Sequence, residues 1–196
     1  HAPDDARLEA YAAKVLGDTP GAYTVLLCYI GDQTGVFTTL RELGRTTSRT
    51  LAQAAKVDER YLREWLSALA AGGYVTYHPA DGTFSLNDEQ AIVLAQDGHP
   101  ACMLGLMQGV VAQFATFERA TEVFRNGNGR LWGEHHSCCF AGVDRFFRPG
   151  YDVNLLPSWL PALDGAVAKL ERGAKVADVG CGYGTATVLL PRAFSE

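Results

Sequence analysis

The sequence lacks the long apolar runs, the excess of basic charge and the paired cysteines that mark several classes of protein. None of its uninterrupted apolar runs approaches the roughly 18–20 residues of a membrane-spanning helix, and its N-terminus has no signal-peptide pattern. Lys and Arg number 17 against 22 Asp and Glu, and this net charge of −5 disfavours a binder of nucleic acid or anionic membranes. We therefore expect a soluble, cytoplasmic protein.

The cysteines are odd in number and scattered along the chain: Cys28, Cys102, Cys138, Cys139 and Cys181. A disulfide framework requires a short secreted chain with an even number of spaced cysteines. His135 and His136 precede the vicinal pair Cys138 and Cys139, but zinc sites usually present ligand pairs separated by two to four residues, with a second pair elsewhere. The sequence offers no such second pair, so we expect free thiols and no metal site.

The 196 residues, 47% of them hydrophobic, suffice for one domain, or for a small domain and part of another. An amphipathic pattern predicts a helix over residues 4–16, and Thr19, Pro20 and Gly21 predict a break after it. A nearly continuous apolar stretch then predicts a buried helix over 22–34. These two helices carry more apolar surface than a small domain covers, which predicts a homodimer through the N-terminal region.

Residues 38–87 predict a winged helix-turn-helix. A helix over 38–43 ends at Gly44, a second begins with a Ser48 cap, and a third begins with an Asp58 cap and runs to residue 71. The third helix has one apolar face, made of Leu62, Trp65, Leu66 and Leu69. Residues 74–78 and 83–86 then predict a hairpin around a Pro-Ala-Asp-Gly turn.

DNA recognition is the usual function of this motif, but the charges argue against it. The helix over 58–71 has Arg60 and Arg63 against Asp58, Glu59 and Glu64, and the hairpin from Tyr77 to Phe84 has no Lys or Arg. Contacts with phosphates supply most of the affinity for DNA. We therefore predict that the winged helix serves packing and dimerisation rather than nucleic-acid binding.

Beyond it, the sequence predicts a long helix over 100–125, an irregular segment over 130–152 that is rich in aromatic side chains, and a helix over 159–170. A stripe of Met and Phe along the first of these, from Met103 to Phe124, is typical of a helix-packing seam that also borders an apolar pocket. The candidate substrate-binding residues of this region are Met103, Met107, Trp132, Phe146, Phe147 and Tyr151.

The strongest motif is a glycine-rich turn between a strand and a helix. Val176, Ala177 and Val179 predict a short buried strand, Gly180, Gly182 and Gly184 predict a tight turn, and a helix begins at Thr185. Glycines let the backbone approach a ligand closely, and a helix N-terminus presents free amides.

Two details of this turn favour one nucleotide ligand. The dinucleotide fingerprint G-x-G-x-x-G requires a third glycine where this chain has Thr185. Asp178, two residues before the first glycine, is poorly placed beside a pyrophosphate, because like charges repel in a cleft of low dielectric constant. A carboxylate suits a ligand with an ammonium and a sulfonium, and S-adenosylmethionine carries both.

The turn Asp178-Val-Gly180-Cys-Gly182-Tyr-Gly184 resembles the first cofactor motif of class I S-adenosylmethionine-dependent methyltransferases. The preceding layout, with Trp132-Gly-Glu-His-His and Phe146-Phe-Arg-Pro-Gly-Tyr151, is similar to the bacterial subgroup that has an N-terminal winged helix. The resemblance implies a cofactor site at Asp178, Gly180, Cys181, Gly182 and Gly184, and a small apolar or aromatic acceptor. His135 and His136 are the candidate catalytic bases.

The family's sheet has seven strands, whereas this sequence stops one helix after the first, so we expect a fragment of the enzyme or its ordered N-terminal part. The expected fold is mainly α: a winged-helix dimerisation domain over 1–95, a helical linker and substrate-pocket region over 96–172, and over 173–196 the first βα unit of a Rossmann-like domain. The alternatives are a winged-helix transcriptional regulator, a dimerisation module without catalysis and, opposed by Asp178 and Thr185, a nicotinamide-dependent oxidoreductase.

Overall fold

The computed structural model describes residues 4–194, and the fold is mainly helical, as the sequence predicts. The chain divides into two compact units, His1–Ala95 and Gln96–Glu196. The described residues contain one sheet, a two-stranded antiparallel hairpin in the first unit.

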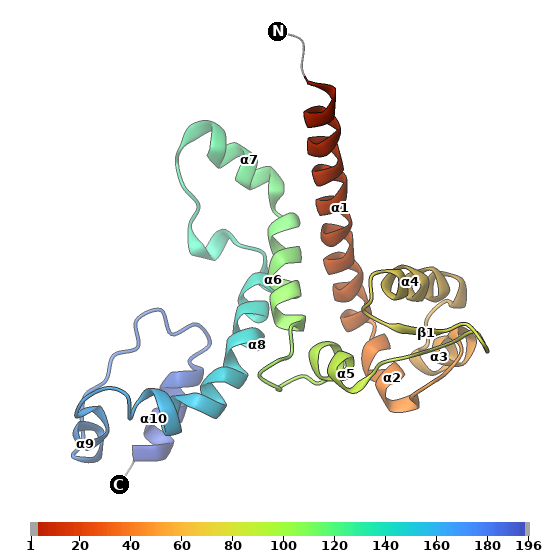
Figure 1. Cartoon of the computed structure of the whole chain (residues 1–196). Coiled ribbons are helices and arrows are strands. Elements are labelled where there is room, and N and C mark those ends of the chain that lie inside the picture. Colours follow the sequence, from red (N-terminus) through yellow and green to blue (C-terminus); the bar gives the residue numbers. More distant parts are fainter. Residues whose placement is uncertain (1–3, 195–196) are drawn as a thin grey trace. The chain divides into compact units, whose positions relative to one another are not determined.

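The first unit begins with a single long helix, α1 (Asp5–Gln33), and not with the two helices that we predicted (Figure 1). Pro20 lies inside it and cannot donate the usual hydrogen bond to the preceding turn. The hydroxyl of Thr19 donates to the Val15 carbonyl at 2.9 Å, and that of Thr24 donates to the Pro20 carbonyl at 2.9 Å. These bonds engage one carbonyl before the proline and the carbonyl of the proline itself, and the helix continues through it.

A winged helix-turn-helix follows α1, and its elements gather at the C-terminal end of that helix (Figure 1). It comprises α2 (Val36–Leu43), α3 (Ser48–Ala55), α4 (Glu59–Ala71) and the strands β1 (Thr76–His78) and β2 (Thr83–Ser85). Asp58 caps α4 as predicted, whereas Thr47 and not Ser48 caps α3. Thr46 and Phe84 exchange two backbone hydrogen bonds beside the hairpin.

The core of this unit lies between α1, α2, α3 and α4. Its most fully buried side chains are Phe37, Leu40, Leu51, Leu66, Leu69 and Cys28. The predicted apolar face of α4 is buried, and its Trp65 donates through Nε1 to the Leu27 carbonyl at 2.8 Å. A further helix, α5 (Asp88–Ala95), ends the unit.

The second unit opens with α6 (Leu104–Phe114) and α7 (Phe117–Asn126), so the predicted single helix over 100–125 is wrong at its start and in its middle. Turn residues at 115 and 116 end α6 and change the direction of the Met and Phe stripe. Its first members are partly buried, whereas Phe114, Phe117 and Phe124 are exposed. The stripe is therefore not a continuous packing seam within these residues.

The segment predicted to be irregular forms the longest helix of this unit. A 3₁₀ turn (Trp132–Glu134) leads into α8 (Ser137–Asn154), which packs side by side with α6 (Figure 1). Pro149 lies inside α8 without ending it. A π turn (Leu155–Trp159) continues the helix, and α9 (Ala166–Glu171) is much shorter than the predicted helix over 159–170.

The glycine-rich segment contains the predicted turn and helix but not the predicted strand. Helix α10 (Thr185–Phe194) begins where expected and contacts α8, whereas residues 173–178 are irregular. Val176 and Val179 are exposed instead of buried. A parallel strand requires neighbouring strands for its backbone hydrogen bonds, and the sheet of the described residues lies in the other unit.

Candidate functional site

A cavity of about 270 Å³ lies in the second unit between α8 and the glycine-rich turn. One wall comes from the 3₁₀ turn and α8, and the other comes from the glycine-rich turn and the first residues of α10. The lining residues are Trp132, Phe140, Val143, Asp144, Phe147, Tyr151, Asp178, Gly180, Cys181, Gly182, Tyr183, Thr185 and Ala186. Aromatic side chains thus face a polar backbone turn.

The glycines of the turn are required by its backbone conformation. Gly180, Gly182 and Gly184 have φ values of 80°, 57° and 80°, in the left-handed region that other residues rarely adopt. A Cβ atom added at Gly180 or Gly182 would meet nothing within 4 Å, so the turn leaves open space beside its backbone. The first amides of α10 lie at the end of this turn, because the helix begins at Thr185.

Two carboxylates line the cavity, and a threonine of α10 donates a hydrogen bond to each. Thr187 donates to Asp178 Oδ2 at 2.8 Å, and Thr185 donates to Asp144 Oδ1 at 3.2 Å. Asp178 is exposed, whereas only 10% of the Asp144 side chain is exposed. Arg148, one turn further along α8, forms an ion pair with Asp144 Oδ2.

The aromatic wall is held by contacts between rings. Trp132 lies edge-on to Phe140 at a centroid distance of 5.3 Å and also contacts the His135 ring at 5.1 Å. Tyr151 lies edge-on to Trp159 at 5.7 Å. These contacts fix the rings that border the cavity, because edge-to-face pairs favour a defined geometry.

The cavity brings together seven of the residues singled out in the sequence: Trp132, Phe147, Tyr151, Asp178, Gly180, Cys181 and Gly182. Gly184 lies at the end of the same turn without lining the cavity, and Phe146 contacts the Phe147 ring at 5.0 Å. Met103 precedes α6 and Met107 lies within it, and neither lines the cavity.

The two histidines precede α8 and do not line the cavity. His136 caps the helix, since its Nδ1 accepts a hydrogen bond from the Cys138 amide at 3.2 Å. Nδ1 of His135 is buried and has no hydrogen-bond partner among the described residues. The His135 ring contacts a residue of the cavity wall, Trp132.

Sequence reasoning missed Phe140, Val143, Asp144, Tyr183, Thr185 and Ala186 as lining residues. A signal for part of this set was present. Phe140, Asp144, Phe147 and Tyr151 follow helical spacing, which places them on one face of a helix. That face was hidden because we predicted no helix over residues 130–152.

Residues 4–194 contain neither a metal-ligating cluster nor a membrane-spanning helix. This part of the chain contains no group of three or more His, Cys, Asp or Glu side chains that could hold a metal ion. None of its helices is both long and apolar enough to cross a membrane.

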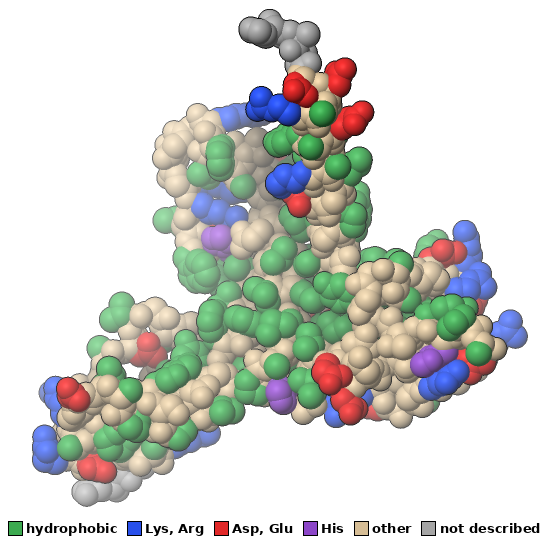
Figure 2. Space-filling model, in the orientation of Figure 1, with side chains coloured by type: hydrophobic (Ala, Val, Ile, Leu, Met, Phe, Trp, Pro, Cys, Tyr) green, Lys and Arg blue, Asp and Glu red, His purple; other side chains and the backbone are tan. Residues whose placement is uncertain are grey.

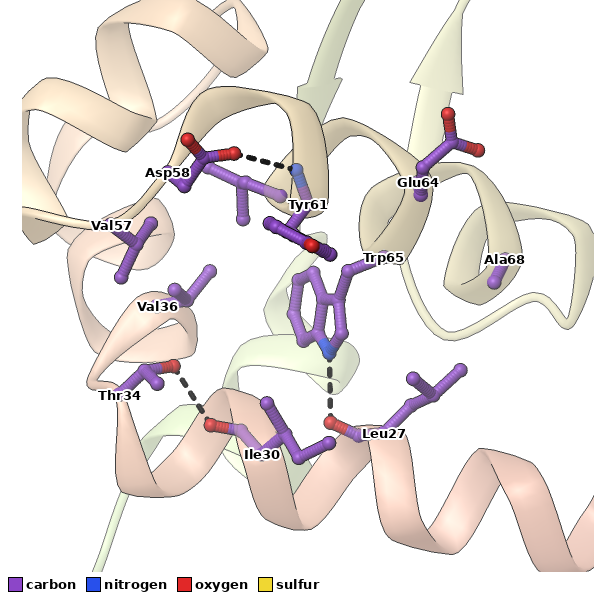
Figure 3. A pocket seen from close by; sticks show the side chains of 11 residues that line it. Leu27, Ile30, Thr34, Val36, Val57, Asp58, Tyr61, Glu64, Trp65 and Ala68 are labelled. Carbon is purple, nitrogen blue, oxygen red and sulfur yellow. Dashed lines mark hydrogen bonds between the residues drawn. The ribbon is translucent and has the colours of Figure 1, made fainter.

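The first unit contains another cavity, of about 450 Å³, between α1 and α4 (Figure 3). Its floor is apolar, with Leu27, Ile30 and Trp65 among the lining residues. Asp58 and Glu64 also line it, and Asp58 accepts a hydrogen bond from the Tyr61 amide at 3.1 Å. The shape and the apolar lining suit an apolar segment or ligand.

Comparison with known proteins finds a similar domain within the first unit and a similar fold for the chain. Residues 22–96 match the family model of the Rv2258c-like winged HTH domain. Among solved structures, the mitomycin 7-O-methyltransferase MmcR is 20% identical, with a TM-score of 0.61 over 97% of this chain and 57% of its own.

Two further solved structures have a similar fold. PigF, in a structure described as containing SAH, is 16% identical (TM-score 0.58, 93% of this chain and 55% of its own), and TnmH is 21% identical (TM-score 0.55, 98% and 56%). The chain therefore spans a little over half the length of these proteins. No curated protein matched the sequence. Residues 22–96 are thus similar to the Rv2258c-like winged HTH domain, and the chain has a fold similar to that of part of these structures.

Proposed function

We propose that this chain is the N-terminal part of an S-adenosylmethionine-dependent methyltransferase that acts on a small apolar or aromatic acceptor. The observation that carries the proposal is the cavity in which the glycine-rich turn and Asp178 face the aromatic side of α8. The similar fold of MmcR, a mitomycin 7-O-methyltransferase, supports it. On this reading residues 1–95 form a dimerisation domain, 96–172 a linker and substrate region, and 173–196 the beginning of the cofactor domain.

The residues of the cavity fit this cofactor better than a dinucleotide. The lining residues include two carboxylates and no Lys or Arg, which disfavours a pyrophosphate and favours a ligand with positive charges. Gly180 and Gly182 leave open space for close approach to the backbone. Bound there, the cofactor would supply an activated methyl group, and Asp178 would hold its cationic methionine end. Cys181 and Gly184 complete the turn.

The acceptor is proposed to lie against the aromatic wall. Trp132, Phe147 and Tyr151 offer flat apolar surfaces that exclude water, and methyl transfer depends mainly on positioning the two reactants. His135 is the better placed of the two proposed bases, because its buried Nδ1 is not engaged, whereas Nδ1 of His136 caps α8. Met103, Met107 and Phe146 are proposed as outer substrate contacts.

Calorimetry on the full-length protein tests the cofactor assignment. Asp178→Asn keeps the shape of the side chain and removes its charge. A charged hydrogen bond contributes roughly 1.5–3 kcal/mol, so binding of S-adenosylmethionine should weaken about ten- to a hundredfold. Asp152→Asn, at an exposed position of α8 outside the cavity, is the matched control and should leave binding unchanged.

Two results would refute the assignment: binding of NAD by the full-length protein, or unchanged affinity for S-adenosylmethionine in Asp178→Asn. The chain spans a little over half the length of the solved structures with a similar fold. We therefore expect the chain alone to bind the cofactor weakly or not measurably.

We further propose that a second copy of the chain covers the apolar side of α1. Exposed large side chains run along this helix (Figure 2), namely Leu8, Tyr11, Val15, Leu16 and Tyr23. The C-terminal part of the same helix lines the apolar cavity of the first unit. A two-fold dimer would bury both surfaces, because each copy offers a helix stripe and a groove.

Light scattering tests this assembly. The unaltered protein should be a dimer at micromolar concentration, and Leu16→Glu should shift it to monomer, because the charge would be buried in the interface. Glu9→Gln, also exposed on α1, should remain dimeric. A monomeric unaltered protein, or a dimeric Leu16→Glu variant, would contradict the proposal.

Nucleic acid is not a proposed partner. On α4, Glu59 Oε1 lies 3.7 Å from Arg63 Nη1. At the hairpin, Asp81 Oδ2 lies 2.6 Å from Arg45 Nη2. These cations are therefore partly neutralised where a winged helix would meet phosphates. We expect no sequence-specific DNA complex at physiological salt. A nanomolar complex that weakens when Arg60 and Arg63 are replaced would overturn this prediction.

A further inference from the structure

A second carboxylate in the cavity has no role in the function proposed above. Asp144 lies on α8, opposite the glycine-rich turn, and its side chain is much less exposed than that of Asp178. Removing a carboxylate from water is unfavourable unless other groups compensate for the lost hydration. Asp144 therefore requires positive or hydrogen-bonding groups nearby that offset its charge.

The neighbours of Asp144 compensate for its charge only in part. One oxygen accepts a hydrogen bond from the Thr185 hydroxyl, which is neutral, and the other pairs with Arg148. The Arg148 side chain is 54% exposed, so solvent screens its charge, and exposed ion pairs contribute little. Arg148 itself does not line the cavity. Seen from inside the cavity, Asp144 remains an anionic group.

The aromatic side chains near Asp144 also suit a cation. Phe140, Phe147 and Tyr151 lie on the same face of α8, and the faces of aromatic rings attract positive charge. A sulfonium is a cation surrounded by carbon, with no hydrogen to donate. Aromatic faces and the negative charge of a carboxylate therefore suit it, whereas donors of hydrogen bonds do not.

We propose that Asp144 is a specificity-determining residue that recognises the sulfonium charge of the cofactor and so favours the methyl donor over its product. This inference rests on the proposed function. When the methyl group leaves, the positive sulfonium becomes a neutral thioether, whereas the ammonium of the methionine end persists. A carboxylate near the sulfonium therefore stabilises the bound donor and not the bound product, which assists release of the product.

The test compares the affinities of the full-length protein for S-adenosylmethionine and S-adenosylhomocysteine by calorimetry. Asp144→Asn should weaken binding of the methionine compound on the order of tenfold, and that of the homocysteine compound by less than about twofold. Asp178→Asn should weaken both, because both carry the ammonium. Asp152→Asn on the same helix should change neither.

Arg148→Gln gives a prediction of opposite sign. Removing the competing cation should make Asp144 more negative towards the cavity and tighten binding of S-adenosylmethionine. If Asp144 and Arg148 only hold α8 in place, Arg148→Gln should instead weaken both ligands. This variant alters an exposed side chain, so it keeps the inference testable if Asp144→Asn fails to fold.

Equal weakening of both ligands by Asp144→Asn, or weaker binding of both ligands in Arg148→Gln, would overturn the inference while the proposed function stands. No binding of S-adenosylmethionine by the unaltered protein would overturn both. A selective loss in Asp144→Asn together with a gain in Arg148→Gln would support the inference.

Discussion

The crossing of α6 and α8 gives a prediction whose size follows from backbone distances. A Cβ atom added at Gly142 would lie 2.7 Å from the Gly105 carbonyl oxygen and 2.7 Å from the Gly109 amide nitrogen. Real Cβ atoms essentially never approach other atoms so closely, and both neighbours belong to helix backbone. Gly142→Ala must therefore push the two helices apart.

The expected cost is the difference between two effects. Overfilling a packed site costs about 1–3 kcal/mol, and a clash with rigid backbone belongs at the upper end of that range. Replacing glycine by alanine within a helix stabilises by about 1 kcal/mol. We therefore expect Gly142→Ala to lower the stability of the second unit by about 2 kcal/mol.

Gly150→Ala is the matched control on the same helix. The nearest atom to its added Cβ would be Trp159 Cη2 at 3.9 Å, an ordinary contact. Only the helix-propensity gain remains, so this variant should be up to about 1 kcal/mol more stable than the unaltered chain. The two substitutions should thus have opposite signs.

Native-state hydrogen exchange with mass spectrometry measures these changes separately in each unit. Amides of α8 should exchange faster in Gly142→Ala and slower in Gly150→Ala, while those of α4 in the first unit serve as an internal reference. Unchanged protection of α8 in Gly142→Ala would refute the close crossing. A fall in protection of α4 alone would show that the reasoning addressed the wrong unit.

Three further predictions concern the hairpin, the thiols and the turn. Hydrogen bonds from Arg45 and Thr83 lower the pKa of Asp81 from 3.8 to about 2. The Arg45–Asp81 ion pair therefore stabilises the hairpin above pH 3.8, and this stabilisation is lost as the pH falls towards 2. Arg45→Gln should return the pKa of Asp81 towards 3.8 in an NMR titration. Burial raises the pKa of the Cys28 thiol to about 12, so iodoacetamide should label the exposed Cys181 far faster, and equal rates would contradict the burial. Gly182→Val should abolish cofactor binding in a chain that still folds by circular dichroism, because a β-branched residue is strained at a φ of 57°.

The winged helix could be predicted from the sequence because several of its boundaries carry a local signal. Gly44 ends α2, Asp58 begins α4, and the Pro-Ala-Asp-Gly turn separates β1 from β2. The apolar spacing of α4 also identified its buried face. Such features depend on a few neighbouring residues, and tertiary packing reinforces them.

The two long helices were not predicted as such. We interpreted Thr19, Pro20 and Gly21 as a break and residues 130–152 as irregular, whereas α1 continues through Pro20 and α8 continues through Pro149. A proline costs a helix about 3 kcal/mol or more, but packing of the flanking turns can exceed this cost. Pro149 is itself buried, and this packing cannot be seen in the sequence.

The same error explains why only part of the cavity was found. Its glycine-rich side depends on local backbone conformation, and the motif at residues 178–184 identified it. The opposite side depends on which residues of α8 share a face, and Asp144 could be chosen only after that segment was known to be helical. The glycine-rich side of the cavity could therefore be predicted from the sequence, whereas the side formed by α8 could not.

The missing strand follows from the same distinction between local and long-range structure. Gly180 and Gly182 adopt their positive φ values, and α10 forms behind them, without any sheet. Val176, Ala177 and Val179 form the short apolar run of a buried strand, yet Val179 is 95% exposed, because a parallel strand is stabilised only by neighbours on both faces and edges. Under the proposed function, the remaining strands of the enzyme would cover these valines and fix the position of Asp178. The turn is thus formed by its own glycines, whereas the affinity of the site depends on the sheet that anchors it.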